Sequence, residues 1–260
     1  MLNKETEFSA NDAWICLLSK VFFDGNVVTP RKAKTRELLN TCLTAHMSYP
    51  EINLPGRKIN DKFRAAEAAW ILSGDNKVDT ITKYCKRYGE YSDDGIFMNG
   101  AYGPPVVDQL PYIIKALKKD HCTRQAVISI WRPKPGESKD IPCTISLQFL
   151  IRNGQLHCIA TMRSNDIWLG TPYDIFTFSM ICHYIIATEP KFRVKGLRPG
   201  FLYLNAGSTH IYEQDWKKAK KLLLNVPPII HMKDSLWKGV TLEFKSGREV
   251  IDYLWSTANG

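Results

Sequence analysis

Three groups of side chains that could do chemistry follow one another in the middle of the chain. Cys143 comes first, Arg163 and Ser164 follow about twenty residues later, and Asp174 comes after them. A guanidinium near a thiol favours the nucleophilic thiolate, and arginine also binds phosphate through two parallel hydrogen bonds. A lone cysteine is, however, more often a small buried apolar residue. The pattern predicts a nucleophile, an anion-binding pair and a carboxylate on three consecutive elements.

Glu67 is a further candidate, and it lies on the clearest helix that the sequence predicts. Asn60 is a suitable N-cap for this helix and Gly74 is a suitable stop. Glu67 is four residues from Phe63 and three from Trp70, so it shares their apolar face. Burial there would raise its pKa and suit it to proton transfer near neutral pH. The alternative is a glutamate at the helix edge that pairs with a lysine.

Apolar periodicity and turn residues predict the elements that must position these side chains. Besides residues 60–74, helices are predicted after Ser9 up to Asp24-Gly25 and at 80–91, 106–118, 175–187, 215–224 and 248–255. Strands are predicted at 125–131, 144–152, 156–162, 201–205 and 241–244, with a hairpin turn at Asn153-Gly154. Residues 27–36 are interpreted as a basic loop, either a solvated connector or an arm that brings Arg31 onto a phosphate. This mixture indicates an α+β fold with a mostly antiparallel or mixed sheet.

Composition narrows the class of protein. A chain of 260 residues with 44% hydrophobic residues suits one domain, or one with an appended cap. Its seven cysteines form no CxxC pair, so we expect neither a metal site nor a disulfide framework. The acidic start without an apolar core predicts no signal peptide and a cytoplasmic protein. The apolar run 175–187 is interrupted and short, so we expect no membrane span.

The formal net charge of +9 suits solubility, and it also suits an anionic ligand. Lysine and arginine are spread along the chain, without a basic block interleaved with aromatic residues. A small phosphate-bearing ligand is therefore expected rather than nucleic acid.

The order of several short motifs resembles the thymidylate synthase family from about residue 10 to residue 216. The motifs are Glu67-Ala68-Ala69-Trp70, Gly100-Ala101-Tyr102-Gly103, Pro142-Cys143, Gln148-Phe149, Met162-Arg163-Ser164-Asn165-Asp166, Leu169-Gly170-Thr171-Pro172-Tyr173-Asp174 and Ser208-Thr209-His210-Ile211-Tyr212. The resemblance implies one domain over residues 1–260, with a mixed sheet flanked by helices and a homodimer packed sheet against sheet. It also implies methylenetetrahydrofolate as the one-carbon donor and a pyrimidine nucleotide as the acceptor.

The resemblance assigns roles to residues of this chain. Cys143 would attack C6 of the pyrimidine, Glu67 would order water and move protons, and Tyr102 would assist proton removal at C5. The binding residues that it implies are Arg31, Arg163, Ser164 and the partner subunit's Arg124 for the 5′-phosphate, Gln148 for the pyrimidine pocket, His210 and Tyr212 for the sugar 3′-hydroxyl, and Asp166, Gly170 and Tyr88 for folate or base.

Asp174 departs from the family members that use uracil, which resemble this chain but carry asparagine there. A carboxylate accepts hydrogen bonds from the N4 amino group and from a protonated N3 of cytosine, and it stabilises the protonated ring. In Asp174 and in Cys143-Thr144 the chain resembles the cytidylate hydroxymethylases. We therefore expect a cytosine nucleotide as the substrate.

Two more differences from the synthases of the family concern the reaction product and the sugar of the nucleotide. Tyr88 and Tyr91 stand where synthases place tryptophans over the folate, and the residues after Trp255 lack the hydrophobic tail that closes a synthase site. A wetter site lets water add to the one-carbon unit, so we expect a 5-hydroxymethyl rather than a 5-methyl product. Gln125 replaces one of two consecutive arginines, which favours CMP over dCMP. The alternatives are a CMP or dCMP methylase, a synthase acting on dUMP, and a non-catalytic nucleotide- or RNA-binding protein.

Overall fold

The computed structural model describes residues 9–133, 136–225 and 244–260. The α-helices are α1 (Ala10–Asp24), α2 (Asp61–Leu72), α3 (Val78–Thr82), α4 (Gly103–Lys119), α5 (Thr171–Thr188), α6 (Pro190–Val194), α7 (Glu213–Leu223) and α8 (Gly247–Asn259). Two 3-10 turns are η1 (Pro30–Lys32) and η2 (Lys86–Tyr91). The strands are β1 (Asn26–Val28), β2 (Thr35–His46), β3 (Val127–Ser129), β4 (Thr144–Arg152), β5 (Gln155–Met162), β6 (Asn165–Asp166) and β7 (Arg198–Tyr212).

These strands form one mixed sheet, which confirms the expected α+β fold with its helices flanking the sheet. The order in the described chain is β1-β2-β7-β5-β4-β3, and β6 pairs with β7. β7 is parallel to β5 and β6, whereas the other pairs are antiparallel. β4 and β5 form the predicted hairpin, because Asn153 and Gly154 both adopt the positive φ angles of 51° and 71° that a tight primed turn requires.

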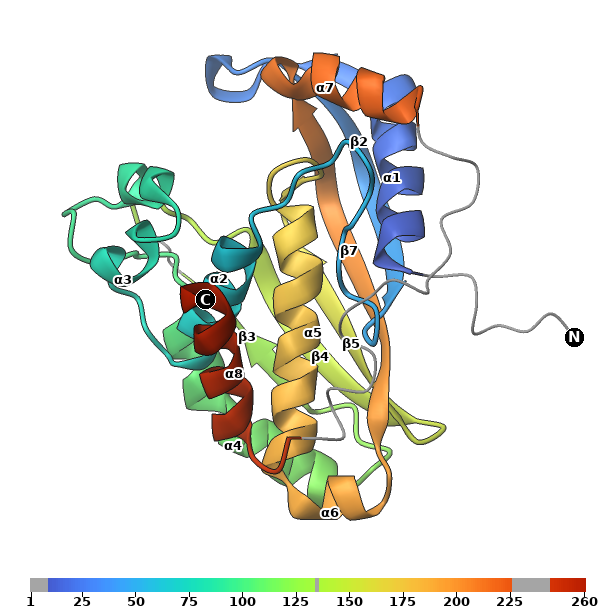
Figure 1. Ribbon diagram of the computed structural model, residues 1–260, viewed down its shortest axis with the longest axis vertical. Helices are drawn as coiled ribbons and strands as arrows, with labels where there is room; N and C mark the ends of the chain where they lie inside the picture. The colour runs from blue at the N-terminus through green and yellow to red at the C-terminus, as the bar shows by residue number, and fades with distance from the viewer. Residues whose placement is uncertain (1–8, 134–135, 226–243) are drawn as a thin grey trace, which may run out of the picture.

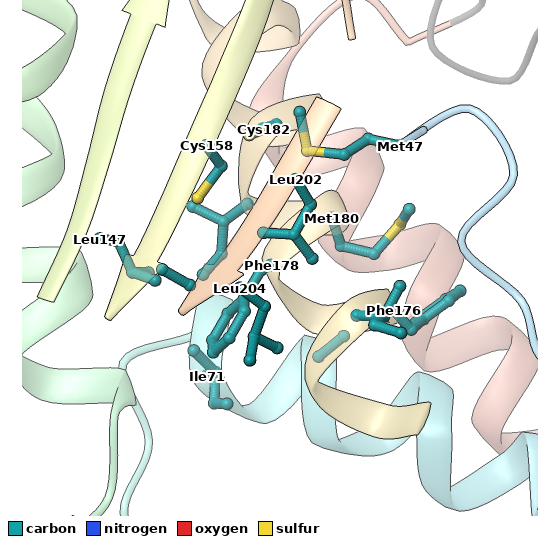
Figure 2. Packing of buried hydrophobic residues seen from close by; sticks show 14 of the residues in the cluster. Met47, Ile71, Leu147, Cys158, Phe176, Phe178, Met180, Cys182, Leu202 and Leu204 are labelled. Carbon is teal, nitrogen blue, oxygen red and sulfur yellow. The ribbon is translucent and has the colours of Figure 1, made fainter. Parts of the chain in front are cut away.

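Helix α5 is the centre of the core and lies along the sheet, with α2 and α8 on one side of it and α1 on the other (Figure 1). It is apolar almost all round, as expected of a helix enclosed by other elements. The buried helix predicted at 175–187 is thus confirmed. Figure 2 shows its side chains against those of the sheet; the labelled residues are Met47, Ile71, Leu147, Cys158, Phe176, Phe178, Met180, Cys182, Leu202 and Leu204.

Within α5, two of the polar residues that interrupt the apolar run have hydrogen-bond partners, whereas the buried Thr177 hydroxyl has none among the described residues. The Ser179 hydroxyl donates to the Ile175 carbonyl at 2.7 Å, and the His183 ring lies 3.3 Å from the Met47 carbonyl. Burial lowers the pKa of His183 to about 4, so its ring is neutral at physiological pH. In the part of the chain that the structure describes, no helix is both long and apolar enough to cross a bilayer.

The N-caps predicted for two helices are confirmed. The Ser9 hydroxyl accepts from the Asp12 amide at the start of α1, and the Asn60 side chain accepts from the Phe63 amide at the start of α2. α4 begins three residues before the predicted helix, because prolines in a first turn lose no helical hydrogen bond. Gly103 opens this helix, and a Cβ there would lie 2.6 Å from the Asp75 carbonyl oxygen.

Several predicted boundaries were wrong. The basic loop at 27–36 is instead part of β1, the turn η1 and the start of β2, because pairing with β7 imposes an extended backbone on a polar sequence. The helix predicted at 80–91 is divided into α3 and η2. The strand predicted at 125–131 is shorter, and the strand predicted at 201–205 is part of the much longer β7. Residues 241–243 of the strand predicted at 241–244 lie outside the described residues.

Candidate active site

One cleft of about 890 Å³ collects side chains from both halves of the chain. Its size is that of a pocket for drug-sized ligands. Most of the site residues assigned from the sequence line this cleft: Arg31, Glu67, Tyr88, Tyr102, Cys143, Arg163, Ser164, Asp166, Gly170, Asp174, His210 and Tyr212. Tertiary folding therefore brings the expected nucleophile, acids and arginines to one place.

Cys143 lies just before β4 and is half-buried. The thiol pKa is raised because burial and the nearby carboxyl groups of Asp174 and Asp140 outweigh the lowering by Arg163 and Arg31. The sequence suggested that the arginine would favour the thiolate; the net effect of the surrounding groups is the opposite. Cys143 therefore rests as a thiol, and it must lose its proton before it can act as a nucleophile.

Arg163 is held beside Cys143 by the backbone. Its Nε donates to the Pro142 carbonyl at 2.9 Å, and Nη2 donates to the Ile141 carbonyl at 2.8 Å. The guanidinium also lies 5.9 Å from the centre of the Trp131 ring. Because these contacts use the Nε hydrogen and one Nη2 hydrogen, both hydrogens of Nη1 and the second of Nη2 are left to meet an anion.

Tyr102 lies on the other side of the nucleophile. The Thr144 amide donates to its hydroxyl oxygen at 3.2 Å, which fixes the phenol next to Cys143. Burial, together with the nearby Cys143 and Asp174, raises the Tyr102 pKa well above its ordinary value. The phenol therefore keeps its proton near neutral pH and can donate it in a hydrogen bond.

Glu67 faces the cleft from α2, as its position on the apolar face predicted. Burial raises its pKa to about 7, and a hydrogen bond from the Tyr88 hydroxyl to Oε1 partly opposes the rise. Among the described residues no lysine pairs with Glu67, so the alternative of an edge ion pair does not hold. A carboxyl with this pKa exchanges protons readily near neutral pH.

Asp174 lies in the first turn of α5, where its amide bonds to the Gly170 carbonyl at 3.0 Å. Burial raises its pKa well above the ordinary aspartate value, and the charges of Glu67 and Asp166 add to the shift. The raised pKa favours the acid form of the Asp174 side chain, which has one hydroxyl donor and one carbonyl acceptor. This is a different state from the carboxylate that the sequence suggested.

Asp166 closes the turn before α5. Its Oδ1 accepts from the amides of Trp168 and Leu169, each at 2.9 Å. Burial nevertheless raises its pKa to about 6. Together with Glu67 and Asp174, Asp166 gives this end of the cleft a set of carboxyl groups that cannot all be ionised cheaply.

The opposite end of the cleft is basic and polar. Arg31 enters it from η1 with a φ of 49°, which turns the chain sharply between β1 and β2. His210 and Tyr212 project from β7, and their ring centres lie 5.2 Å apart. Burial lowers the His210 pKa, so its ring is neutral near pH 7 and can both donate and accept. Arginine, Ser164 and a neutral imidazole suit a sugar phosphate.

Glu37 is a cleft residue that sequence reasoning missed. It lies on β2 directly opposite His210 on β7, and the Ser208 hydroxyl donates to its Oε1 at 2.5 Å. It follows the predicted loop at 27–36 and was assigned to no element, so no periodicity pointed to the cleft. Only the pairing of β2 with β7, which are distant in sequence, brings this carboxyl beside the His210 ring. Trp131, Lys139 and Asp140 also line the cleft and were missed.

Gln148 corrects the sequence assignment. It does not line the cleft, because the alternation of β4 points it to the other face of the sheet, where its Nε2 donates to the Arg124 carbonyl at 2.9 Å. Gln148 is therefore not part of the pyrimidine pocket of this chain. Arg124 is exposed and also lies outside the cleft of its own chain. Its expected contribution to a partner's site stays a prediction.

Comparison with known proteins adds to this geometry. Residues 12–233 match the family described as thymidylate synthase. The chain belongs to the thymidylate synthase family. This confirms the resemblance that the motifs suggested.

Three similar proteins illustrate the range of the family. A deoxyuridylate hydroxymethyltransferase of Bacillus phage SP01 is 31% identical over 220 residues, which is 77% of this chain and 56% of that protein. A deoxyuridylate hydroxymethyltransferase of Pseudomonas phage M6 is 33% identical over 176 residues, 64% of this chain and 48% of that protein. A putative thymidylate synthase of Methanosarcina acetivorans is 25% identical over 219 residues, 83% of this chain and 92% of that protein. The chain thus spans about half the length of the two phage relatives.

Proposed function

We propose that this protein transfers a one-carbon unit from 5,10-methylenetetrahydrofolate to C5 of a pyrimidine nucleoside 5′-monophosphate and leaves it there as a hydroxymethyl group. The observation that carries the proposal is the meeting of Cys143, Tyr102, Glu67 and Asp174 in one cleft with Arg31 and Arg163. A nucleophile, proton carriers and an anion site are the groups that such chemistry needs.

The arrangement assigns a direction to the bound nucleotide. Its phosphate meets Arg31, Arg163 and Ser164, and its sugar lies by His210 and Tyr212. The base then reaches between Cys143 and Asp174, so that the thiol can add to C6. Addition at C6 makes C5 nucleophilic, and Tyr102 is placed to help remove the C5 proton.

The folate co-substrate fits the remaining wall of the cleft. Phe63, Trp70, Tyr88 and Tyr91 form an aromatic wall there, which suits the flat ring of a pterin. When bound, the folate supplies the one-carbon unit. Asp166 and Gly170, at the start of α5, lie where polar edges of the folate or the base would be held.

We propose cytosine as the base because the acid form of Asp174 is favoured. Its hydroxyl can donate to N3 of cytosine while its carbonyl accepts from the N4 amino group. Transfer of that proton to N3 gives a carboxylate and a protonated ring, which makes C6 more electrophilic. We propose CMP over dCMP because Glu37 adds an acceptor for sugar hydroxyls beside His210.

The names of two similar phage proteins favour a second candidate, hydroxymethylation of dUMP. A neutral Asp174 could also match uracil, by accepting from N3–H and donating to O4. The two bases are separated by a chemical argument: N3 of cytosine is basic enough to take the proton of Asp174, whereas O4 of uracil is only polarised by a hydrogen bond from it. A cytidylate methylase remains a rival within the same chemistry.

We also propose that the protein acts as a homodimer through the sheet face that bears Gln148. On that face Gln148, Ile159 and Tyr203 are neighbours across β4, β5 and β7, and all three are half-buried in one chain. A second sheet would cover them and bring Arg124 to the partner's phosphate site.

The test is to incubate the protein with methylenetetrahydrofolate and CMP, dCMP, UMP or dUMP in turn. Mass spectrometry of the nucleotide separates hydroxymethyl from methyl products, and absorbance detects any dihydrofolate. We expect 5-hydroxymethyl-CMP without dihydrofolate. Exclusive conversion of dUMP to its 5-methyl product would contradict both the base and the product. A Cys143→Ala protein that keeps its activity in cells would favour the non-catalytic alternative.

A further inference from the structure

We propose that Tyr88 is a positioning residue that holds Glu67 for the attack of water, and thereby directs the reaction to the hydroxymethyl product. This rests on the proposed function. The Tyr88 hydroxyl donates a hydrogen bond to Oε1 of Glu67, and both residues line the cleft. The contact joins η2 to α2, two elements that the chain brings together only in the folded protein.

The ring of Tyr88 has little freedom to move. Its centre lies 5.3 Å from that of Phe63, 6.3 Å from that of Trp70 and 6.4 Å from that of Tyr91, with nearly perpendicular planes in the last two pairs. Phe63 and Trp70 are on α2, on the same face as Glu67. The aromatic cluster therefore fixes the phenol relative to the helix that carries the carboxyl.

This fixed contact divides the two oxygens of Glu67 between different tasks. Oε1 accepts from Tyr88, which leaves Oε2 to accept from a water in the cleft. Burial and the nearby Glu67, Tyr102 and Asp174 keep the Tyr88 pKa well above its ordinary value, so its hydroxyl remains a donor. Glu67 alternates between acid and base near neutral pH, while Tyr88 holds its orientation in both states.

The step that this arrangement serves can be written in full. Once the one-carbon unit is on C5 and tetrahydrofolate has left, the nucleotide carries a methylene group doubly bonded to C5 and the Cys143 sulfur on C6. The water oxygen bonds to the methylene carbon, and Glu67 takes a proton from the water. The methylene electron pair then restores the C5–C6 double bond as the sulfur–C6 bond breaks and thiolate leaves. Water is the only added reactant, and nothing is oxidised or reduced.

The test compares Tyr88→Phe with Tyr91→Phe as the matched control. Both substitutions remove one phenol oxygen from the same aromatic cluster, but in the described contacts it is Tyr88 that bonds to Glu67. Two quantities are measured in each protein: the Glu67 pKa, by carbon NMR of glutamate-labelled protein with Glu67→Gln to identify the signal, and the rate and identity of the C5 product.

We expect Tyr88→Phe to raise the Glu67 pKa, because the hydrogen bond that lowers it is lost. We also expect a fall of about tenfold or more in kcat for the hydroxymethyl product, the size of one hydrogen bond to a charged group, with little change in the KM for nucleotide. The acidic limb of the pH–rate profile should move to higher pH. Tyr91→Phe should leave the Glu67 pKa unchanged, because the hydrogen bond to Glu67 comes from Tyr88.

An unchanged Glu67 pKa in Tyr88→Phe would overturn the proposal, as would an equal effect of Tyr91→Phe on pKa and kcat. The NMR measurement needs no turnover, so it still decides the role of Tyr88 if the wild-type protein forms no hydroxymethyl nucleotide. That last result would count against the proposed function instead. Thermal melting of both variants checks that each is folded.

Discussion

Replacement of Asp174 by asparagine gives the sharpest test of how the base is chosen. The two side chains have nearly the same shape, and Asp174 is buried in the cleft with its pKa raised well above the ordinary value. The amide can still form two hydrogen bonds to a base, but it cannot give up a proton. The substitution therefore removes acid catalysis at N3 while largely preserving the hydrogen-bonding shape of the site.

The expected magnitude follows from this loss. A well-placed general acid contributes about 10²- to 10⁴-fold to a rate. We expect Asp174→Asn to lower kcat/KM for cytosine nucleotides by about a hundredfold or more. With uracil the amide still accepts from N3–H and donates to O4, so the turnover of uracil nucleotides should be unchanged or increased. The ratio of the two values of kcat/KM should thus shift toward uracil by at least the same factor.

The pH dependence of turnover tests the roles of Asp174 and Glu67 independently. Because the pKa of Asp174 is raised, its acid form persists to higher pH and is lost as pH rises through that pKa. Glu67, with a pKa of about 7, must be ionised to act as a base, so its contribution is lost as pH falls below that value. The pH–rate profile of the wild-type protein with a cytosine nucleotide should therefore fall on both the acidic and the alkaline side. In Asp174→Asn the alkaline limb that belongs to Asp174 should disappear.

The assay measures initial rates for CMP, dCMP and dUMP over a range of pH, with products identified by mass. Asp140→Asn is the matched control, because Asp140 also lines the cleft but accepts from the Gly100 amide at 2.7 Å, away from Asp174. It should leave the ratio of cytosine to uracil turnover unchanged. The reasoning is refuted if Asp174→Asn keeps its preference for cytosine nucleotides.

Three further predictions test other parts of the structure. Cys143→Ser should reduce turnover by more than about a thousandfold while nucleotide binding, followed by tryptophan fluorescence, survives; normal turnover would place the nucleophile elsewhere. Glu37→Gln should lower kcat/KM for CMP by about tenfold relative to dCMP, because a charged acceptor for a sugar hydroxyl is lost, and an unchanged ratio would show that the 2′ position is read elsewhere. Glu51→Gln should lower the free energy of unfolding by about 3 kcal/mol in urea titration, since the buried Arg64, bonded to Glu51 at 2.7 Å, would keep only the exposed Asp61 at 3.1 Å as an ionised partner; a loss below about 1 kcal/mol would indicate that water reaches this pair.

Local sequence signals predicted the elements whose evidence is contained within a few residues. Asn60 and Ser9 cap helices because a short polar side chain can accept from a free amide two or three residues on. Asn153-Gly154 makes the hairpin because both residues tolerate positive φ. The apolar face around Glu67 also predicted that burial would raise its pKa.

Features that depend on the pairing of strands far apart in the chain could not be predicted from the sequence. Only the first two residues of β2 fell in the predicted loop at 27–36 and the rest was assigned to no element. Its antiparallel pairing with β7 makes it a strand and brings Glu37 to the cleft. The face that Gln148 presents follows from the register of β4 against its neighbours, so the motif that contains it gave no warning that it points away. Strand pairing of this kind is set by the whole sheet.

The sequence by itself determined the chemical groups: a thiol, a guanidinium, a phenol and two acids, in an order that identified the family. The tertiary structure alone decided the protonation states of these groups. Burial outweighs the arginines at Cys143 and favours the acid form of Asp174, because the cost of removing a charge from water depends on everything packed around it. The hydrogen bond from Tyr88 to Glu67 is also decided by the tertiary structure, since it forms only where η2 folds against α2.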